Sequence, residues 1–262
     1  MKKTGKSLIS VLLPIRPEAS GLVASVQSIK NQSVNDWHII ALLDRDNGDN
    51  LATLNSLLSE EQFTAVSCNY QEVGFPAMLN LGLLHCEGSF VARQDDDDIS
   101  TPNRFELQID CLTGNEAVSL CCGFARVIDD SGNYLYSIKQ PADNTLLSIE
   151  LVKNNILPHS SVMFRKEAIQ KLGGYRLDMH GCEDYDLWLR LLSVGQISSV
   201  NETILTYLSN PLGMTKTPIS LSTIRKLRIS RMNAQREIGL GPCKANINDY
   251  VWSMRQILNQ YL

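Results

Sequence analysis

Short apolar runs alternate with amphipathic segments along the first part of the chain. The runs are almost continuously apolar, which is typical of strands buried on both faces of a parallel sheet, and the segments between them carry apolar residues at helical spacing. The predicted strands cover residues 8–14, 37–43, 65–70 and 89–93, and the predicted helices cover residues 21–32, 51–58 and 74–86. This alternation predicts an α/β fold with a mostly parallel central sheet flanked by helices.

The second part of the chain keeps both kinds of element but loses the strict alternation. Helices are predicted over residues 101–112, 143–154, 166–172 and from 183 onward, and strands over residues 117–122, 134–138, 161–164, 197–200 and 204–208. Two further helices are predicted beyond Pro218. We therefore divide the chain into an α/β domain of residues 1–214, with halves 1–110 and 111–214, and a helical C-terminal extension of residues 215–262.

Composition narrows the functional classes. Of the 262 residues, 44% are hydrophobic and 20% are charged, as in ordinary soluble enzymes, and the net charge of −4 argues against a protein that coats nucleic acid. The seven cysteines form no CxxC pair, so we expect reduced thiols in a cytoplasmic protein rather than disulfides or a zinc site.

The apolar run at 8–13 is too short for a signal peptide, because Pro14 and Arg16 follow at once. No stretch approaches the ~20 apolar residues of a membrane span.

Polar loops follow three of the predicted strands, at residues 14–18, 44–49 and 95–98. The carboxyl ends of parallel strands meet at one edge of a sheet, so these loops should share a crevice. The third loop consists of four consecutive aspartates, which repel one another and indicate a bound cation. Mg²⁺ and Mn²⁺ prefer carboxylate oxygens, often together with substrate phosphates. The open alternative is a solvated acidic loop in which Asp98 caps the following helix.

The alternation of side chains along an extended segment divides the aspartates into two groups. Asp95 and Asp97 should face the same ligand, while Asp96 points away. An EF-hand is excluded, because the loop that begins at Asp44 has its glycine at the wrong position and the aspartate run contains none.

A second acidic pair, Glu183 and Asp184, precedes a helix whose apolar stripe contains Leu187, Trp188 and Leu191. One interpretation is ordinary helix chemistry, since acids are common at helix N-termini. The other is a general base, for which a carboxylate must lie beside the group that loses its proton. Spacing alone leaves both interpretations open, and it assigns Trp188 to the core.

The segment LNLGLLHCEGSFVARQDDDDISTPNRFELQ resembles the nucleotide-sugar-binding region of family 2 glycosyltransferases, which have the GT-A fold. Other segments resemble the same family in the same order. SVLLPIRPE is similar to the first strand and base-binding loop, and WHIIALLD is similar to the second strand. HSSVMFRKEAIQKLGGY followed by CEDYDLWLRL is similar to the acceptor-side segment with its Glu-Asp motif. The resemblance extends from about residue 7 to about residue 208.

The resemblance implies a role for individual residues. It places Asp184 as the general base with Glu183 in support, and Asp97 and Asp95 as ligands of a Mn²⁺ or Mg²⁺ ion. The residues expected to bind the nucleotide sugar are Pro14, Arg16, Asp44, Asn80, Asp95 and Asp96. Two departures from the family pattern stand out: the base-binding loop, often Pro-Thr-Tyr-Asn, here runs from Pro14 to Pro17 with Arg16 inside it, and leucine replaces an arginine often found before Asn80.

The function implied is inverting transfer of a sugar from a nucleoside diphosphate, expected to be UDP, to an acceptor hydroxyl. The acceptor is expected to be a saccharide or a lipid-linked saccharide in cell-surface polysaccharide or glycolipid synthesis. Two alternatives stay open. One is a metal-dependent nucleotidyltransferase, which also binds Mg²⁺ at strand ends but normally has a glycine-rich phosphate loop. The other is a non-catalytic protein that binds nucleotide sugars on the same scaffold.

Several further polar residues have more than one interpretation. His159 could approach a metal or phosphate, or it could be a structural histidine in a Pro-His-Ser turn. His180 could line an acceptor site. Arg93 and Arg104 flank the aspartate run and could touch phosphate, although balancing the aspartate charge is the simpler role.

The predicted tail helix is basic in an acidic protein. Its cationic residues are Lys216, Arg225, Lys226, Arg228, Arg231 and Arg236. Such a helix fits contact with anionic lipid, which would place a cytoplasmic enzyme at the inner face of the membrane. The alternative, which we favour, is a solvated helix that packs Leu221, Ile224, Leu227 and Met232 on the core.

Overall fold

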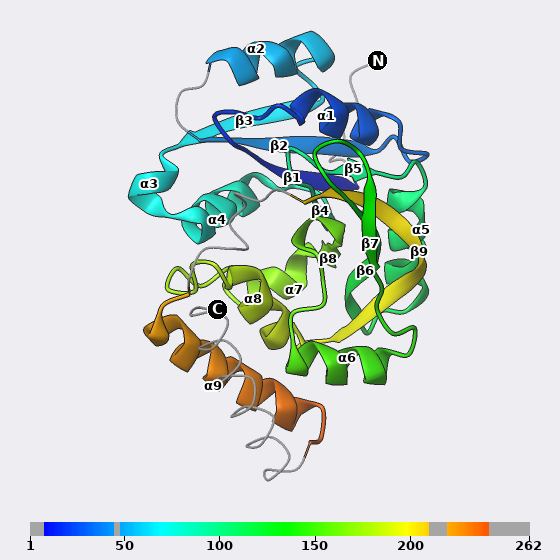
Figure 1. Ribbon diagram of the computed structural model, residues 1–262, viewed down its shortest axis with the longest axis vertical. Coiled ribbons are helices and arrows are strands. Elements are labelled where there is room, and N and C mark those ends of the chain that lie inside the picture. Colours follow the sequence, from blue (N-terminus) through cyan, green and yellow to red (C-terminus); the bar gives the residue numbers. More distant parts are fainter. Residues whose placement is uncertain (1–7, 45–47, 210–218, 241–262) are drawn as a thin grey trace.

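A mixed sheet runs through the molecule, and helices cover both of its faces (Figure 1). The computed structural model describes residues 8–44, 48–209 and 219–240. Within these ranges the sheet has nine strands in the order β3-β2-β1-β4-β8-β6-β9-β5, with β7 paired to β6. The strands are β1 (Ile9–Ile15), β2 (Trp37–Asp44), β3 (Phe63–Cys68), β4 (Phe90–Arg93), β5 (Ile99–Ser100), β6 (Val118–Ile128), β7 (Tyr134–Ile138), β8 (Met163–Arg165) and β9 (Gln196–Leu208).

The helices fall into two layers around this sheet (Figure 1). They are α1 (Leu22–Lys30), α2 (Gly48–Leu57), α3 (Tyr70–Val73), α4 (Phe75–His85), α5 (Arg104–Gly114), α6 (Asn144–Lys153), α7 (Lys166–Lys171), α8 (Glu183–Leu191) and α9 (Leu221–Glu237), with a 3-10 turn, η1, at His159–Ser161. Helices α1, α2 and α5 pack on one face, while α4, α8 and α9 pack on the other. The predicted mixed α/β fold with a mostly parallel sheet and flanking helices is therefore confirmed.

Strand β1 lies at the centre of the parallel part of the sheet. It pairs in parallel with β2 and β4, and β2 pairs in parallel with β3. All seven residues of β1 are buried, and its side chains divide between two cores: Leu12 joins the core around α4 and α8, while Val11 and Leu13 join the core around α1. Because both faces of β1 are buried, its sequence is almost continuously apolar.

Among the described strands, each antiparallel pair includes a strand from the second part of the chain. Strand β8 joins the halves of the sheet, because it pairs antiparallel with both β4 and β6. The predicted strands at 197–200 and 204–208 form one strand, β9, which follows β6 in parallel with register shifts beside Phe124. The exposed polar residues between them interrupt the apolar pattern without ending the backbone pairing.

The C-terminal helix α9 packs onto the core. Ile224, Leu227 and Ala234 belong to the same hydrophobic cluster as Trp188 of α8. Leu221, by contrast, is exposed and Met232 is half-buried, so only part of the predicted apolar face is covered. Lys216 and the second predicted tail helix lie outside the described residues. Among the helices that are described, none is both long enough and apolar enough to cross a lipid bilayer.

We predict that Gly88→Ala destabilises the fold by about 1–3 kcal/mol, because overpacking of a rigid site has a cost of this size. A Cβ on Gly88 would lie 2.7 Å from the main-chain nitrogen of Ser10 and 2.8 Å from the carbonyl oxygen of Leu8, where β4 begins beside β1. Urea denaturation measures the change. The matched control is Gly114→Ala at the end of α5, where a Cβ meets nothing within 4 Å. If the two variants have the same free energy of unfolding, Gly88 is not closely packed against the main chain of β1.

Candidate functional site

A pocket of about 400 Å³ opens at the carboxyl ends of β1, β2 and β4. Its size is within the usual range for small-molecule sites. The site residues expected from the sequence that line it are Pro14, Arg16, Asp44, Asp95, Asp96, Asp97, Glu183 and Asp184. The fold thus brings the aspartate run and the acid pair, which are far apart in the chain, to one pocket.

The first turn of α1 holds the main chain of the aspartate run. The Oγ of Ser25 donates a hydrogen bond to the carbonyl oxygen of Asp95 at 2.8 Å. A Cβ on Gly21 would lie 2.7 Å from the Cα of Asp97 and 2.9 Å from the carbonyl oxygen of Asp96, so this approach requires glycine. The run is therefore held by main-chain packing, and its carboxylates do not have to hold it in place.

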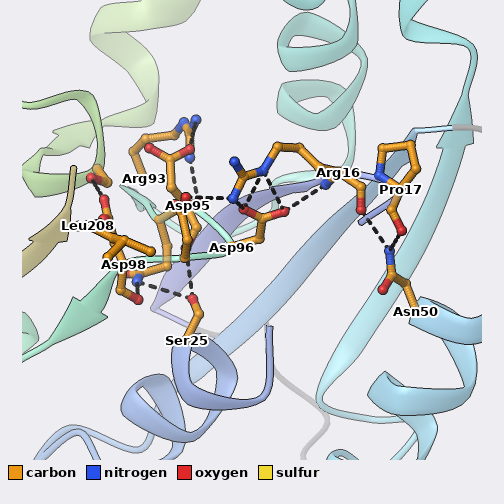
Figure 2. A network of polar contacts seen from close by, with 12 residues as sticks. Arg16, Pro17, Ser25, Asn50, Arg93, Asp95, Asp96, Asp98 and Leu208 are labelled. Carbon is orange, nitrogen blue, oxygen red and sulfur yellow. Dashed lines mark hydrogen bonds and ion pairs between the residues drawn. The ribbon is translucent and has the colours of Figure 1, made fainter. Parts of the chain in front are cut away.

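Each of the first three aspartates has an arginine partner. Asp95 Oδ1 accepts a hydrogen bond from Nη2 of Arg93 at 2.6 Å. Asp96 Oδ2 accepts from the main-chain nitrogen of Arg16 at 2.7 Å, and its Oδ1 accepts from Nη2 of Arg16 at 2.6 Å. Asp97 Oδ2 accepts from the same Nη2 at 2.5 Å. Figure 2 shows Arg93 beside Asp95 and Arg16 beside Asp96.

The expected alternation of side chains does not hold within the run. Asp96 and Asp97 lie in a turn beyond the end of β4, and alternation applies only to extended backbone. Asp96, which the alternation directs away from the ligand, lines the pocket beside Arg16. Burial raises the pKa of Asp96 and of Asp97, and the neighbouring charge of Asp95 raises both further.

The fourth aspartate, Asp98, joins three segments of the chain. It is fully buried, and it accepts hydrogen bonds from the hydroxyl of Ser160 and, at 3.0 Å, from the main-chain nitrogen of Leu208. Burial raises its pKa well above the ordinary value. It is not the cap of the next helix, since α5 begins at Arg104 after Asn103. Asp98 therefore ties the aspartate run to η1 and β9.

Arg104 is a structural residue behind the run. It is fully buried, and its guanidinium donates to Oε1 of Gln94 at 2.7 Å and to the carbonyl oxygen of Arg93 at 2.7 Å. Burial lowers its pKa to about 9, although the charge of Asp98 opposes the shift. Arg93, in contrast, is among the residues that line the pocket.

The charges of the pocket leave a place for a cation. Its six acidic residues are Asp44, Asp95, Asp96, Asp97, Glu183 and Asp184, and its two arginines are Arg16 and Arg93. Within the described residues no three His, Cys, Asp or Glu side chains are grouped to hold a metal by themselves. Mg²⁺ commonly needs only one or two carboxylates when substrate phosphates complete its ligands, so Asp95 and Asp97 fit a cation that arrives with a phosphorylated molecule.

The acid pair begins α8 on the other side of the pocket. Glu183 is buried, and its Oε2 accepts a hydrogen bond from the main-chain nitrogen of Gly181 at 2.6 Å. Asp184 Oδ2 accepts from Nδ2 of Asn155 at 3.0 Å. Burial raises the pKa of Glu183 to about 7, with the charge of Asp184 adding to the shift, and burial also raises the pKa of Asp184. The pair can therefore hold and release a proton near neutral pH.

The aromatic residues of the pocket were not expected from the sequence. Tyr70 and Phe75 line it from the segment after β3, with their rings 6.0 Å apart, and the main-chain nitrogen of Tyr70 donates to Oδ1 of Asp44 at 2.9 Å. His180 is exposed, and its Nε2 lies 3.3 Å from the hydroxyl of Tyr70. The expected strand at 65–70 left no place for the short helix α3, which begins at Tyr70, and Phe75 is the first residue of α4.

His159, whose interpretation the sequence left open, has structural contacts, and Trp188 belongs to the core. His159 lines the pocket, but its Nε2 lies 2.9 Å from the hydroxyl of Tyr175 and its ring meets Trp188 edge-on at 5.6 Å. Burial lowers the pKa of His159 well below the ordinary value, so the ring is neutral. Trp188 is fully buried, as the apolar stripe predicts.

Asn80 does not line this pocket. Its Nδ2 donates to the carbonyl oxygen of Tyr175 at 2.7 Å, and its Oδ1 accepts from the main-chain nitrogen of Tyr175 at 2.8 Å. Both ends of the amide thus join α4 to the segment that leads to α8. The structure gives Asn80 a connecting role between the two sides of the pocket.

Comparison with known proteins identifies the family. Residues 10–173 match the family described as glycosyl transferase family 2, which is more than half of the chain. The chain belongs to this family. It is 31% identical to the O-antigen biosynthesis glycosyltransferase WbnJ of Escherichia coli, over 71% of this chain and 72% of that protein. It is also 31% identical to an E. coli UDP-Gal:alpha-D-GlcNAc-diphosphoundecaprenol beta-1,3-galactosyltransferase, over 71% of this chain and 68% of that protein.

Solved structures with the same fold include two glycosyltransferases. TarS residues 1–349 of S. aureus in complex with UDP-GlcNAc has a TM-score of 0.69 and 13% identity, over 88% of this chain and 70% of that chain. Mannosyltransferase PcManGT of Pyrobaculum calidifontis in complex with GDP-Man and Mn²⁺ has a TM-score of 0.60 and 13% identity, over 98% of this chain and 74% of that chain. The fold of this family 2 glycosyltransferase is accordingly the GT-A fold.

We predict that the carboxyl group of Glu183 titrates near pH 7 in the folded protein, because burial and the charge of Asp184 raise its pKa from the ordinary 4.5 to about 7. Because the folded state keeps this proton longer than the unfolded chain, the free energy of unfolding should fall as the pH rises from about 4.5 to about 7. Glu183→Gln should make that fall smaller and lower the pKa of Asp184. Carboxyl ¹³C NMR measures both pKa values, with the exposed Glu87→Gln as the matched control. If the pKa of Asp184 is unchanged in Glu183→Gln, the two carboxyl groups do not interact electrostatically and the prediction is wrong.

Proposed function

We propose that this enzyme transfers a sugar from a nucleoside diphosphate to an acceptor hydroxyl with inversion at the anomeric carbon. The observation that carries the proposal is the single pocket that joins the aspartate run at the end of β4 to the acid pair at the start of α8. One side suits an anionic leaving group with its cation, and the other side suits proton removal. A displacement reaction needs both on opposite sides of the reacting carbon.

The donor is assigned to the side formed by β1, β2 and β4. Asp44 lies beside Tyr70 and Phe75, which offer polar and aromatic contacts for a nucleobase and ribose, and Pro14 borders the same side. Asp95 and Asp97 would hold Mn²⁺ or Mg²⁺. When bound, such an ion neutralises charge that develops on the departing diphosphate. A nucleoside diphosphate is supported by TarS with UDP-GlcNAc and PcManGT with GDP-Man and Mn²⁺, and UDP by the named substrate of the galactosyltransferase relative.

The acceptor is assigned to the side formed by α8. Asp184 accepts the proton of the attacking hydroxyl, with the amide of Asn155 holding one of its oxygens. Glu183 adds charge and orients the turn through Gly181. Direct attack by the acceptor, with no covalent intermediate on the enzyme, inverts the anomeric configuration. Relatives named for O-antigen and diphosphoundecaprenol-linked saccharide synthesis support an acceptor in cell-surface polysaccharide or glycolipid synthesis.

The decisive experiment measures release of free nucleoside diphosphate from a panel of nucleotide sugars with Mn²⁺ and a lipid-linked or free saccharide acceptor. We predict that Asp184→Asn lowers turnover by about 10²–10⁴-fold, the range of general-base catalysis, and keeps metal-dependent donor binding. Asp97→Ala should lose both. The exposed Asp110→Asn on α5 is the matched control.

Each rival function gives a different result in the same experiment. A nucleotidyltransferase would release pyrophosphate from a nucleoside triphosphate and a sugar phosphate. A non-catalytic binding protein would retain donor binding with no turnover on any acceptor. Full activity of Asp184→Asn would overturn the base assignment, and activity independent of divalent cations would overturn the metal assignment.

A peripheral membrane position is part of the same proposal, and α9 supports it. Its outer face carries Leu221, Arg225 and Ile229, with Leu221 and Ile229 each more than half exposed. The exposed Leu177 lies beside Ile229 in a shallow hollow next to α9. Arg231, in contrast, is fully buried and donates to the carbonyl oxygen of Val152 at 2.9 Å. The helix thus packs on the core and still presents an apolar and basic face.

We predict that the protein co-sediments with vesicles that contain phosphatidylglycerol and not with vesicles of phosphatidylcholine alone. Each basic residue near an anionic surface contributes about 1 kcal/mol, so the double variant Arg225→Glu/Arg228→Glu should bind at least about tenfold more weakly. Arg126→Glu at an exposed position of β6 is the control for a charge reversal away from α9. If the protein sediments equally with both kinds of vesicle, it does not recognise anionic lipid, and the only role of α9 is to pack on the core.

A further inference from the structure

The guanidinium of Arg16 spans two carboxylates of the aspartate run. Its Nη2 lies 2.6 Å from Oδ1 of Asp96, and its Nε donates to Asp96 at 3.0 Å (Figure 2). The same Nη2 lies 2.5 Å from Oδ2 of Asp97. Asp97 is the carboxylate assigned to the metal. A cation that uses this oxygen of Asp97 must therefore replace an arginine already in contact with it.

The main chain of Arg16 is held from both sides. Its nitrogen donates to Oδ2 of Asp96 at 2.7 Å, and its carbonyl oxygen accepts from Nδ2 of Asn50 at 2.8 Å. Its side chain, however, is 46% exposed, whereas the side chains of Asp96 and Asp97 are 3% and 13% exposed. The guanidinium can consequently turn away from the carboxylates while the end of β1 stays in place.

Arg93 makes a useful contrast because it is also paired with an aspartate of the run. Its side chain is only 1% exposed, and it donates to the carbonyl oxygen of Gln94 as well as to Asp95. Arg93 is enclosed by its own contacts. Arg16 is thus the arginine of this pocket whose exposure allows it to exchange partners.

Charge determines when that exchange is favourable. A divalent cation at Asp97 would lie close to a guanidinium, and like charges at such short range repel strongly. A diphosphate offers the guanidinium a replacement, since arginine binds phosphate oxygens with paired, charge-assisted hydrogen bonds. When the guanidinium leaves, Asp96 keeps the hydrogen bond from the main-chain nitrogen of Arg16, and the cation compensates the charge of Asp97.

We propose that Arg16 is a built-in counter-cation that pairs with Asp96 and Asp97 in the donor-free enzyme and moves to the donor diphosphate when a divalent cation binds. The metal and the nucleotide then bind cooperatively, whereas the metal alone binds weakly. This role rests on the proposed function, since it assumes a metal-bound nucleoside diphosphate. It assigns Arg16 as a positioning residue that couples the two ligands.

The test is a Mn²⁺ titration followed by electron paramagnetic resonance, without nucleotide and with UDP or, separately, GDP. In the wild type we expect the better nucleotide to tighten Mn²⁺ binding by at least about tenfold. In Arg16→Gln we expect Mn²⁺ alone to bind about tenfold more tightly than to the wild type, and the effect of nucleotide to fall below about threefold. Arg16→Lys, which keeps the charge, should keep weak binding of Mn²⁺ alone.

Arg225→Gln on α9 is the matched control, because it makes the same change of net charge away from the pocket, and it should titrate as the wild type does. Circular dichroism of each variant checks that the protein is folded. If Arg16→Gln and the wild type bind Mn²⁺ alone equally, the role of Arg16 is overturned and the proposed function stands. If the wild type binds no Mn²⁺ even with nucleotide, the metal assignment fails and the role of Arg16 fails with it.

Discussion

Concentrated negative charge at the end of β4 is the constraint on which the site depends. Four consecutive carboxylates cannot be placed together without compensation, and the structure compensates their charges in three ways. Arg93 pairs with Asp95, and Arg16 serves both Asp96 and Asp97. Asp98 is buried among hydrogen-bond donors instead. The close approach of Gly21 and the hydroxyl of Ser25 hold the main chain of the run while its carboxylates keep those partners.

A buried polar network connects this charged run to the rest of the fold. Gln94 follows β4 and donates to the carbonyl oxygen of Asp98 at 2.7 Å, and its Oε1 accepts from both Ser100 and Arg104. Arg104 in turn donates to the carbonyl oxygen of Arg93. Because these groups satisfy one another away from water, the loop has a fixed shape although it contains no regular structure.

The opposite side of the pocket is held through the C-terminal helix. Asp186 is fully buried one turn into α8, where it accepts from the hydroxyl of Ser230 of α9 at 2.6 Å and from Nε of Arg190 at 2.7 Å. Asn80 joins α4 to the segment before α8. The acid pair is therefore positioned by elements from both the first half of the chain and its tail, and α9 is part of the frame around Glu183 and Asp184.

The sequence by itself determined the elements whose pattern comes from burial. The apolar runs that became β1, β2 and β4, and the start of α8 at Glu183, could be located because each repeats a simple period or ends at a polar residue. It also predicted the acidic residues after β2 and β4 that line the pocket, since strand ends of a parallel sheet converge. The brief strand β5 and the helix α3 had no such signal, because they are too short to show one.

Only the tertiary structure decided which partner each polar group has. Asp96 lies beside Arg16, Asn80 bonds to Tyr175, and Arg231 is buried against the carbonyl of Val152. These partners come from segments far apart in the chain, and nothing in the local pattern of apolar and polar residues encodes a hydrogen bond across that distance. The residue types that could do chemistry were visible in the sequence, whereas their contacts, exposure and pKa values arise from how the folded segments meet.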